Sequence, residues 1–244
     1  MPNDSSSTQP TAQQWWARVA YGCEELPAAT AALKASGLLL KPLVRPEALM
    51  SAMARGDALM KGARKITPEK AKRKKPSAEY LRTLQWRLVM SYAGFEIFVK
   101  SITGRLENGN GGIDVPTLEH LLSLLTLPPF QPLPAPRRKS EAKKWLCETG
   151  SAVGDRLGDF LQLNPYDRKV FLEYLNGSSV DNYMRLCLLA KAVRNATAHG
   201  FLSPTKCETL GLTKTIQAIP VHLDSIRMAT VEKISAFHPI SDRH

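Results

Sequence analysis

The spacing of apolar residues between positions 77 and 107 constrains the fold of this chain more than any other feature. One stripe of apolar residues recurs at intervals of three and four, the period of an α-helix. It consists of Leu81, Leu84, Leu88, Tyr92, Phe95, Val99 and Ile102. A second stripe consists of Trp86, Val89, Ala93 and Ile97. Ser77 is suited to cap this helix. A helix that is apolar over most of its circumference is predicted to lie in the middle of a bundle.

Helical signals dominate the rest of the chain as well, and strand signals are sparse. Helices are expected at 13–36 (a pair interrupted near Gly22 and Pro27), 46–61, 118–127, 139–148, 153–163, 167–175, 178–199 and 221–237. The prolines between 128 and 136 predict a stiff extended loop. For the second long helix, 178–199, Ser178 and Asp181 form a capping box, Gly200 suits the position after its end, and Pro204 marks the stop.

These patterns divide the chain into five regions. They are a disordered tail (1–12), an N-terminal helical segment (13–62), a basic linker (63–76), a helical bundle (77–237) and a C-terminal tail (238–244). The sequence therefore predicts an all-α fold, a helical bundle with extra N-terminal helices and a Pro-rich loop.

Several classes of protein are disfavoured by composition. No apolar run is long enough to span a bilayer, and the polar, Ser-rich start lacks a secretory pattern, so we expect a cytoplasmic protein without membrane contact. The four cysteines are scattered and predict buried thiols. The five histidines show no metal-binding spacing, so neither a metal nor another cofactor is expected.

The net charge of +11 is concentrated in two segments. Residues 61–75 contain eight Lys and Arg residues against one Glu, and residues 137–144 contain five against one. Such segments attract a polyanion by counterion release, or they are solvated linkers. The candidate residues for binding a nucleic acid within them are Lys70, Lys72, Arg73, Lys74, Lys75, Arg137, Arg138 and Lys139.

The richest chemistry lies at the end of the second long helix, where Arg194, Asn195 and His199 fall within an arc of about 140°. This arc points away from the side formed by Leu186, Leu189, Val193 and Ala196, so it is expected to meet a neighbouring helix or a second subunit. The alternative is a structural one, in which a cation merely favours the helix C-terminus.

Glu96 lies between the two apolar stripes of the first long helix. A buried carboxylate is costly unless it is paired. Lys100, four residues on, is the local candidate partner, and Arg194 is the distant one.

Together these residues resemble the HEPN superfamily, the higher eukaryotic and prokaryotic nucleotide-binding domains. The motif of that family is an arginine, a polar residue and, a few residues later, a histidine near the end of a long helix, which Arg194, Asn195 and His199 match. The segment 200–204 resembles the exit from that helix in bacterial branches, and 92–98 is similar to their acidic position, at Glu96. The resemblance covers 77–237, and 1–76 lies outside it.

The resemblance implies a helical bundle that forms a homodimer through the motif-bearing helix, with a composite cleft. It also implies a metal-independent endoribonuclease, as in toxins of toxin–antitoxin pairs and in phage-defence effectors, with an antitoxin or regulatory protein as partner. Some members have lost catalysis and act as binding modules for nucleic acid or protein.

RNA supplies its own nucleophile, the 2′-hydroxyl. We expect Arg194 to bind the phosphate through its planar fork and His199 to act as general acid or base. Asn195 would orient the phosphate or the imidazole, and Glu96 would hold Arg194. The rival interpretations are a silent binding module, a DNA-binding regulator and a scaffold. A helix-turn-helix pair, which the DNA-binding interpretation needs, is not evident.

Overall fold

The computed structural model describes residues 26–43, 45–66, 76–106, 112–148 and 164–237, with the backbone alone for 146–148. This part of the chain is all-α, with nine helices and no strand. The helices are α2 (Leu26–Ala35), α3 (Pro46–Lys65), α4 (Ala78–Ile102), α5 (Val115–Leu124), α6 (Lys139–Glu148), α8 (Pro165–Leu175), α9 (Tyr183–Ala198), α10 (Pro204–Thr209) and α11 (Thr213–Ser235). The expected helix at 153–163, both tails and most of the basic linker lie outside the described residues.

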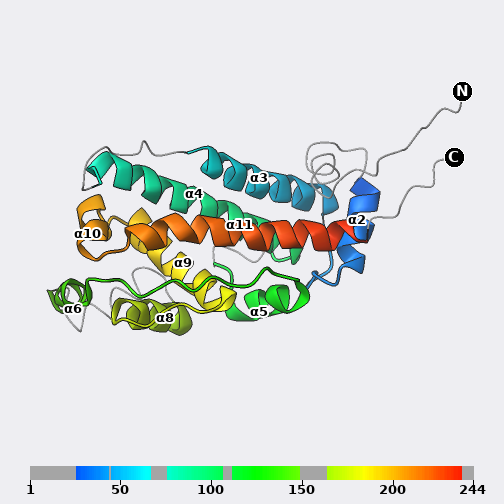
Figure 1. Ribbon diagram of the computed structural model, residues 1–244. Coiled ribbons are helices and arrows are strands. Elements are labelled where there is room, and N and C mark those ends of the chain that lie inside the picture. The colour runs from blue at the N-terminus through cyan, green and yellow to red at the C-terminus, as the bar shows by residue number, and fades with distance from the viewer. Residues whose placement is uncertain (1–25, 44, 67–75, 107–111, 149–163, 238–244) are drawn as a thin grey trace, which may run out of the picture.

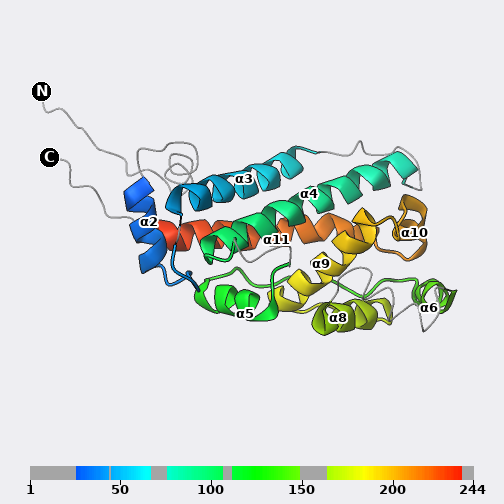
Figure 2. The ribbon, with the colours of Figure 1, turned by 180° about the vertical axis from the view of Figure 1, so that it is seen from behind.

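Three long helices run lengthwise and form the body of the molecule. In Figures 1 and 2, α3 lies along α4, and α11 lies along the other side of α4. Helix α9 crosses obliquely between α4 and the lower edge, where α5 and α8 pack against it. Helix α2 closes one end of the bundle, and α6 and α10 lie at the other end. The predicted site residues Arg194 and Glu96 lie where α9 meets α4.

Helix α4 confirms the first apolar stripe and corrects the second. All seven residues of the first stripe are buried, and the Ser77 hydroxyl accepts a hydrogen bond from the Tyr80 N–H, as a cap does. In the second stripe, Trp86 is 60% exposed, and Val89, Ala93 and Ile97 are only half-buried. The expectation that α4 is covered on all sides is therefore wrong. Helices α3 and α9 pack on its two flanks and leave the arc between them at the surface.

Two glycines bring α3 and α4 into close contact. A Cβ on Gly56 would lie 2.7 Å from the Gly94 carbonyl oxygen, and one on Gly94 would lie 2.6 Å from the Gly56 carbonyl oxygen. Any larger side chain at either position would push the two backbones apart. Helix α3 ends at Lys65, four residues later than the periodicity predicts.

Helix α3 is also tied to α11 by buried charges. The Arg227 guanidinium on α11 donates hydrogen bonds to Asp57 on α3 at 2.6 Å and to Asp224 at 2.9 Å, and all three side chains are buried. Lys61 and Arg64 add ion pairs to Asp57 and Asp224 from the partly exposed edge. A buried charge that is paired on every side fixes the relative position of the two helices.

The second long helix begins later than expected. Val180 forms an antiparallel bridge with Leu133 of the Pro-rich loop, exchanging backbone hydrogen bonds at 2.9 and 3.0 Å. This pairing keeps the chain extended, so α9 begins at Tyr183, and Asn182 caps it by accepting from the Arg185 N–H. The capping box predicted from Ser178 and Asp181 is therefore wrong.

Further boundaries differ from the sequence prediction, among them the end of α4, which is at Ile102 and not at 107. Helix α5 begins at Val115, capped by Asp114, and ends at Leu124. Pro204 does not only stop the preceding helix; it opens α10, because a proline fits the first turn of a helix. Helix α11 begins at Thr213 and carries Pro220 inside, whose ring is buried with the core. Among the described helices, none is long and apolar enough to cross a bilayer.

Candidate functional site

The end of α9 lies against the middle of α4. Leu186, Leu189, Val193 and Ala196 are buried, as the helical wheel predicts. On the opposite side of α9, Arg194 contacts Glu96 of α4 in the same chain, so this face meets a neighbouring helix. The contact with α4 agrees with the first of the two alternatives for this arc, a neighbouring helix, and Asn195 lies within the arc. It is only 6% exposed, because α4 covers it.

Arg194 is held by three different contacts. Its Nη2 donates to Glu96 Oε2 at 2.9 Å, and its Nη1 donates to Asn195 Oδ1 at 2.7 Å. Its guanidinium carbon lies 5.1 Å from the centre of the Tyr92 ring, in the range of a cation–π contact. The side chain remains 26% exposed. Arg194 is therefore positioned by the protein and still accessible to a ligand.

Glu96 makes both of the pairings that the sequence left open. Its Oε2 contacts Arg194, and its Oε1 lies 3.1 Å from Lys100 Nζ. Glu96 and Lys100 are each 16% exposed. Two cations share one carboxylate, so this group of three carries a net charge of about +1 in a partly buried place where salt screens it weakly. Such a charge matches one phosphodiester.

The ring of Tyr92 packs against the Arg194 guanidinium. The sequence does not reveal this contact, because Tyr92 has the spacing of a core residue in the apolar stripe. Burial raises the pKa of its hydroxyl well above the usual value, and the nearby Glu96 raises that pKa further. The hydroxyl therefore stays protonated, and the ring offers Arg194 an uncharged π face.

His199 lies one turn beyond Asn195, at the C-cap of α9. Its backbone N–H donates to the Asn195 carbonyl at 3.0 Å, and its residue is exposed. Gly200 follows with φ of +79°, a left-handed conformation that glycine adopts without strain. Of the three predicted site residues, Arg194 and Asn195 are in direct contact. His199 is exposed at the C-cap of the same helix.

The turn after His199 is fixed on α4. The Leu202 N–H donates to the Ala196 carbonyl at 3.0 Å, and the Gln85 side chain donates to the Leu202 carbonyl. Gln85 is buried and also contacts Cys207 Sγ at 3.1 Å. The sequence did not single out Gln85, because a polar residue beside an apolar stripe gives no sign of a partner 117 positions away.

A second buried ion pair supports α9 one turn before Arg194. Lys191 Nζ lies 2.7 Å from Asp167 Oδ2, and both residues are buried. Burial raises the pKa of Asp167, and the hydrogen bond from Lys191 opposes that rise. This pair links α8 to α9, so it fixes the helix that carries the candidate site. Sequence reasoning missed it, since neither residue has a partner nearby in the chain.

The second basic segment is exposed at the end of the bundle toward which α9 points. Arg137, Arg138 and Lys139 lie at the start of α6, and the backbone of Arg137 approaches the Gly211 turn between α10 and α11. Figures 1 and 2 both place α6 and α10 at this end. The other candidate basic residues, Lys70, Lys72, Arg73, Lys74 and Lys75, lie outside the described residues.

Two cysteines can be ruled out as nucleophiles near neutral pH. Cys187 and Cys207 are buried free thiols, as expected for these two, and burial raises the pKa of each to about 12. Cys23 lies outside the described residues, as does the side chain of Cys147. In the described residues, no group of three or more His, Cys, Asp or Glu side chains is placed to hold a metal ion.

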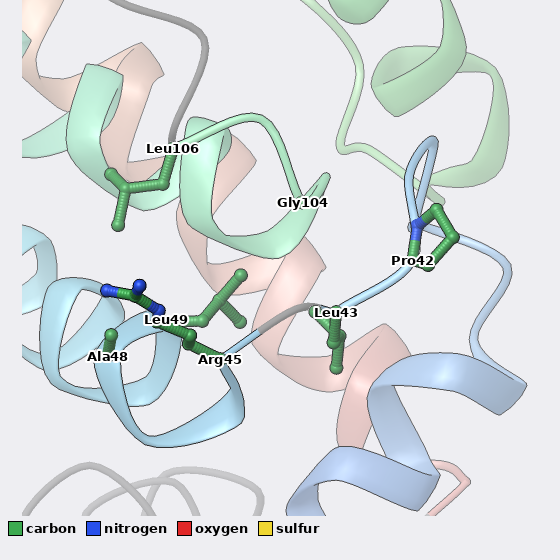
Figure 3. Close-up of a pocket in the computed structure, with 7 residues that line it drawn as sticks. All are labelled: Pro42, Leu43, Arg45, Ala48, Leu49, Gly104 and Leu106. Carbon is green, nitrogen blue, oxygen red and sulfur yellow. The ribbon is translucent and has the colours of Figure 1, made fainter.

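A small pocket lies just beyond the C-terminal end of α4. Its empty volume is about 320 Å³, part of which is open solvent. Figure 3 shows that it lies between the chain before α3, the first turns of α3 and the segment after α4. Its lining residues are Pro42, Leu43, Arg45, Ala48, Leu49, Gly104 and Leu106. The lining is largely apolar and has no proton-transfer group, so we place the chemistry at α9.

Comparisons with known proteins identify no relative. No protein-family model, curated protein or solved structure matches this chain.

Proposed function

We propose that this protein is a metal-independent endoribonuclease of the HEPN type, with an HEPN-like bundle as its fold. The observation that supports this most strongly is the position of Arg194. Its guanidinium is oriented by Glu96, Asn195 and Tyr92, its side chain remains 26% exposed, and His199 is exposed at the end of the same helix. An arginine that serves only to fill space between helices needs neither this orientation nor this access.

Arg194 would bind the non-bridging oxygens of the scissile phosphate. A guanidinium has five N–H donors, and two of the nitrogens each use one donor on Glu96 and Asn195. Donors on both nitrogens are left for an anion. The net positive charge of the Arg194–Glu96–Lys100 group favours the phosphate and stabilises the charge that builds up on it during cleavage.

His199 would transfer protons. In the proposed step the 2′-oxygen attacks phosphorus, the bond from phosphorus to the 5′-oxygen breaks, and a 2′,3′-cyclic phosphate and a 5′-hydroxyl form. The 2′-hydroxyl loses a proton to a base, and the departing 5′-oxygen receives one from an acid. A histidine can serve in either role near neutral pH. Asn195 and Glu96 would keep Arg194 oriented.

The proposal extends to the partners of the site. Basic segments, including Arg137, Arg138 and Lys139, would guide RNA toward α9. A homodimer that brings two α9 ends together would complete the cleft and place both His199 side chains at it. A role as a toxin or phage-defence effector, held in check by an antitoxin, follows from the same resemblance.

A panel of RNAs and matching DNAs tests the activity. Wild-type protein is expected to cleave RNA but not DNA, with full activity in EDTA. Arg194→Ala and His199→Ala should each abolish cleavage while the helical circular dichroism is unchanged. Loss of activity on chelation would defeat the metal-free scheme, and equal cleavage by wild type and His199→Ala would remove His199 from the mechanism.

The second candidate is a catalytically silent module that binds nucleic acid or protein. Two observations favour it. Glu96, Asn195 and Tyr92 already occupy part of the hydrogen-bonding and cation–π capacity of Arg194, and His199 lies at the C-cap of α9. Binding of RNA by wild-type protein without any cleavage, weakened by Arg194→Ala, would support this candidate over the ribonuclease.

A further inference from the structure

Helix α4 exposes an indole ring on its surface-facing side. Trp86 is 60% exposed, although a tryptophan side chain is normally largely buried. Val89, Ala93 and Ile97 continue the same stripe as half-buried residues. The other large exposed apolar residues of the described chain, Tyr166, Val221 and Phe237, lie on or after different helices.

The geometry of α4 places Trp86 on the same side of the helix as Lys100 and Glu96. At about 100° per residue, Trp86 lies about 40° around the helix from Lys100 and about 80° from Glu96. Along the axis, ten residues separate Trp86 from Glu96, which is about 15 Å. The neighbouring Gln85 donates to the carbonyl of Leu202, so this turn of α4 is level with the chain just after His199.

We infer that Trp86 is a stacking platform for a base of the single-stranded RNA whose phosphate lies at Arg194. This inference rests on the proposed function and adds a binding contact to it. Bases stack on exposed aromatic rings whatever their sequence, because every base has a π face. Trp86 and Glu96 are about 15 Å apart along α4, so a strand held at Arg194 would pass over α4 to reach the ring.

The charges along this surface favour a polyanion over a second copy of the chain. Arg82, one turn before Trp86, is exposed, and the net positive Arg194–Glu96–Lys100 group lies farther along. Glu79 on the same face is exposed as well and offsets Arg82, so a second copy would bring another net positive Arg194–Glu96–Lys100 group and no net anion to this surface. A single strand of RNA instead supplies both the bases for the ring and the phosphates for the cations.

Binding of a strand that cannot be cut tests this inference separately from catalysis. The probe is a labelled single-stranded 2′-O-methyl oligoribonucleotide of mixed sequence, whose attacking hydroxyl is blocked, followed by fluorescence anisotropy. Trp86→Ala and Trp86→Leu are expected to raise the Kd about tenfold, as expected for the loss of one stacked base. Trp86→Phe keeps a ring and should bind nearly as wild type.

Tyr166→Ala is the matched control, because Tyr166 is an aromatic residue of similar exposure on α8, at the opposite edge of the molecule in both views. It should leave the Kd unchanged. All variants should melt as wild type does, since both rings are largely in solvent.

Several results would overturn the inference. They are an unchanged Kd in Trp86→Ala, a Trp86→Leu variant that binds as well as Trp86→Phe, and no binding by wild type. A Trp86→Ala variant that changes only the oligomeric state in sedimentation would assign the stripe to a second copy. Ring-dependent binding without cleavage of natural RNA would uphold the stacking role while the proposed function fails.

Discussion

At the residue scale, the site depends on one carboxylate shared by two cations. Glu96 contacts Arg194 through one carboxylate oxygen and Lys100 through the other. Removal of Glu96 and removal of Lys100 should therefore destabilise the fold to different degrees. Loss of Glu96 leaves two partly buried cations without a counter-charge. Loss of Lys100 leaves a complete Glu96–Arg194 pair.

This difference predicts the order of two substitutions. Glu96→Gln should lower the free energy of unfolding by about 1–2 kcal/mol, between the values of exposed and buried pairs. Lys100→Gln should lower it by less than about 1 kcal/mol. Urea denaturation of both variants measures the difference. A larger loss in Lys100→Gln would show that Glu96 supports Lys100 and not Arg194.

His222 predicts a dependence of stability on pH. The ring is half-buried and stacked on Phe130, with 4.7 Å between the ring centres, and burial lowers the pKa of His222. A lowered pKa stabilises the fold above the ordinary pKa of histidine, and this stability is lost as the pH falls through the folded value. The free energy of unfolding of wild type should therefore fall more steeply below pH 6.5 than that of His222→Phe. Parallel curves would contradict the account.

Single residues were predictable from sequence where their chemistry is unfavourable without a partner. Glu96 stood out because a carboxylate between two apolar stripes requires a counter-charge, and the structure shows both of its candidate partners in place. Tyr92, Gln85 and the Asp167–Lys191 pair gave no such sign, since their roles arise only when distant helices meet.

At the element scale, the crossing of α3 and α4 depends on two glycines in contact. Gly56→Ala or Gly94→Ala should destabilise the protein by about 1–3 kcal/mol, because the new methyl group would overlap the backbone of the facing helix. Gly62→Ala, also on α3, is the matched control. Its Cβ would meet only Met90 Cε at 3.9 Å, so the substitution should stabilise by about 0.5–1 kcal/mol. Thermal melts measure all three, and a stabilising Gly56→Ala would refute this packing.

Helix positions followed from the sequence wherever local signals decided them. The bounds of α6 match the prediction, and α4 begins after its predicted cap, Ser77. The start of α9 could not be predicted, because the bridge from Val180 to Leu133 joins segments 47 residues apart. Because of Pro220, the first third of α11 was not predicted; there, burial of Ile216 and Ile219 outweighs the cost of a proline within a helix.

At the scale of the whole molecule, the Arg227 network joins α3 to α11 across the bundle. Arg227→Met should lower the free energy of unfolding by about 3–5 kcal/mol, since Asp57 and Asp224 would lose their buried partner. Lys61→Gln, which removes a partly exposed contact to the same Asp57, should cost about 1 kcal/mol or less. Guanidinium denaturation compares them. Equal losses would show that the buried network adds nothing beyond its surface contacts.

The all-α architecture was predictable from periodicity, whereas the way the helices pack was not. The two apolar stripes of α4 are alike in sequence. The first stripe is buried, whereas the second is partly exposed and includes Trp86. Which stripe is covered depends on where α3 and α9 cross α4, and no local pattern records that.

We propose that Arg194 and His199 cleave RNA through its own 2′-hydroxyl. The most direct measurement is the end-group chemistry of fragments formed in EDTA by wild type and by His199→Ala. We predict fragments with 2′,3′-cyclic phosphate and 5′-hydroxyl ends from wild type and none from His199→Ala. Fragments with 5′-phosphate ends, or the same fragments from both proteins, would contradict the claim.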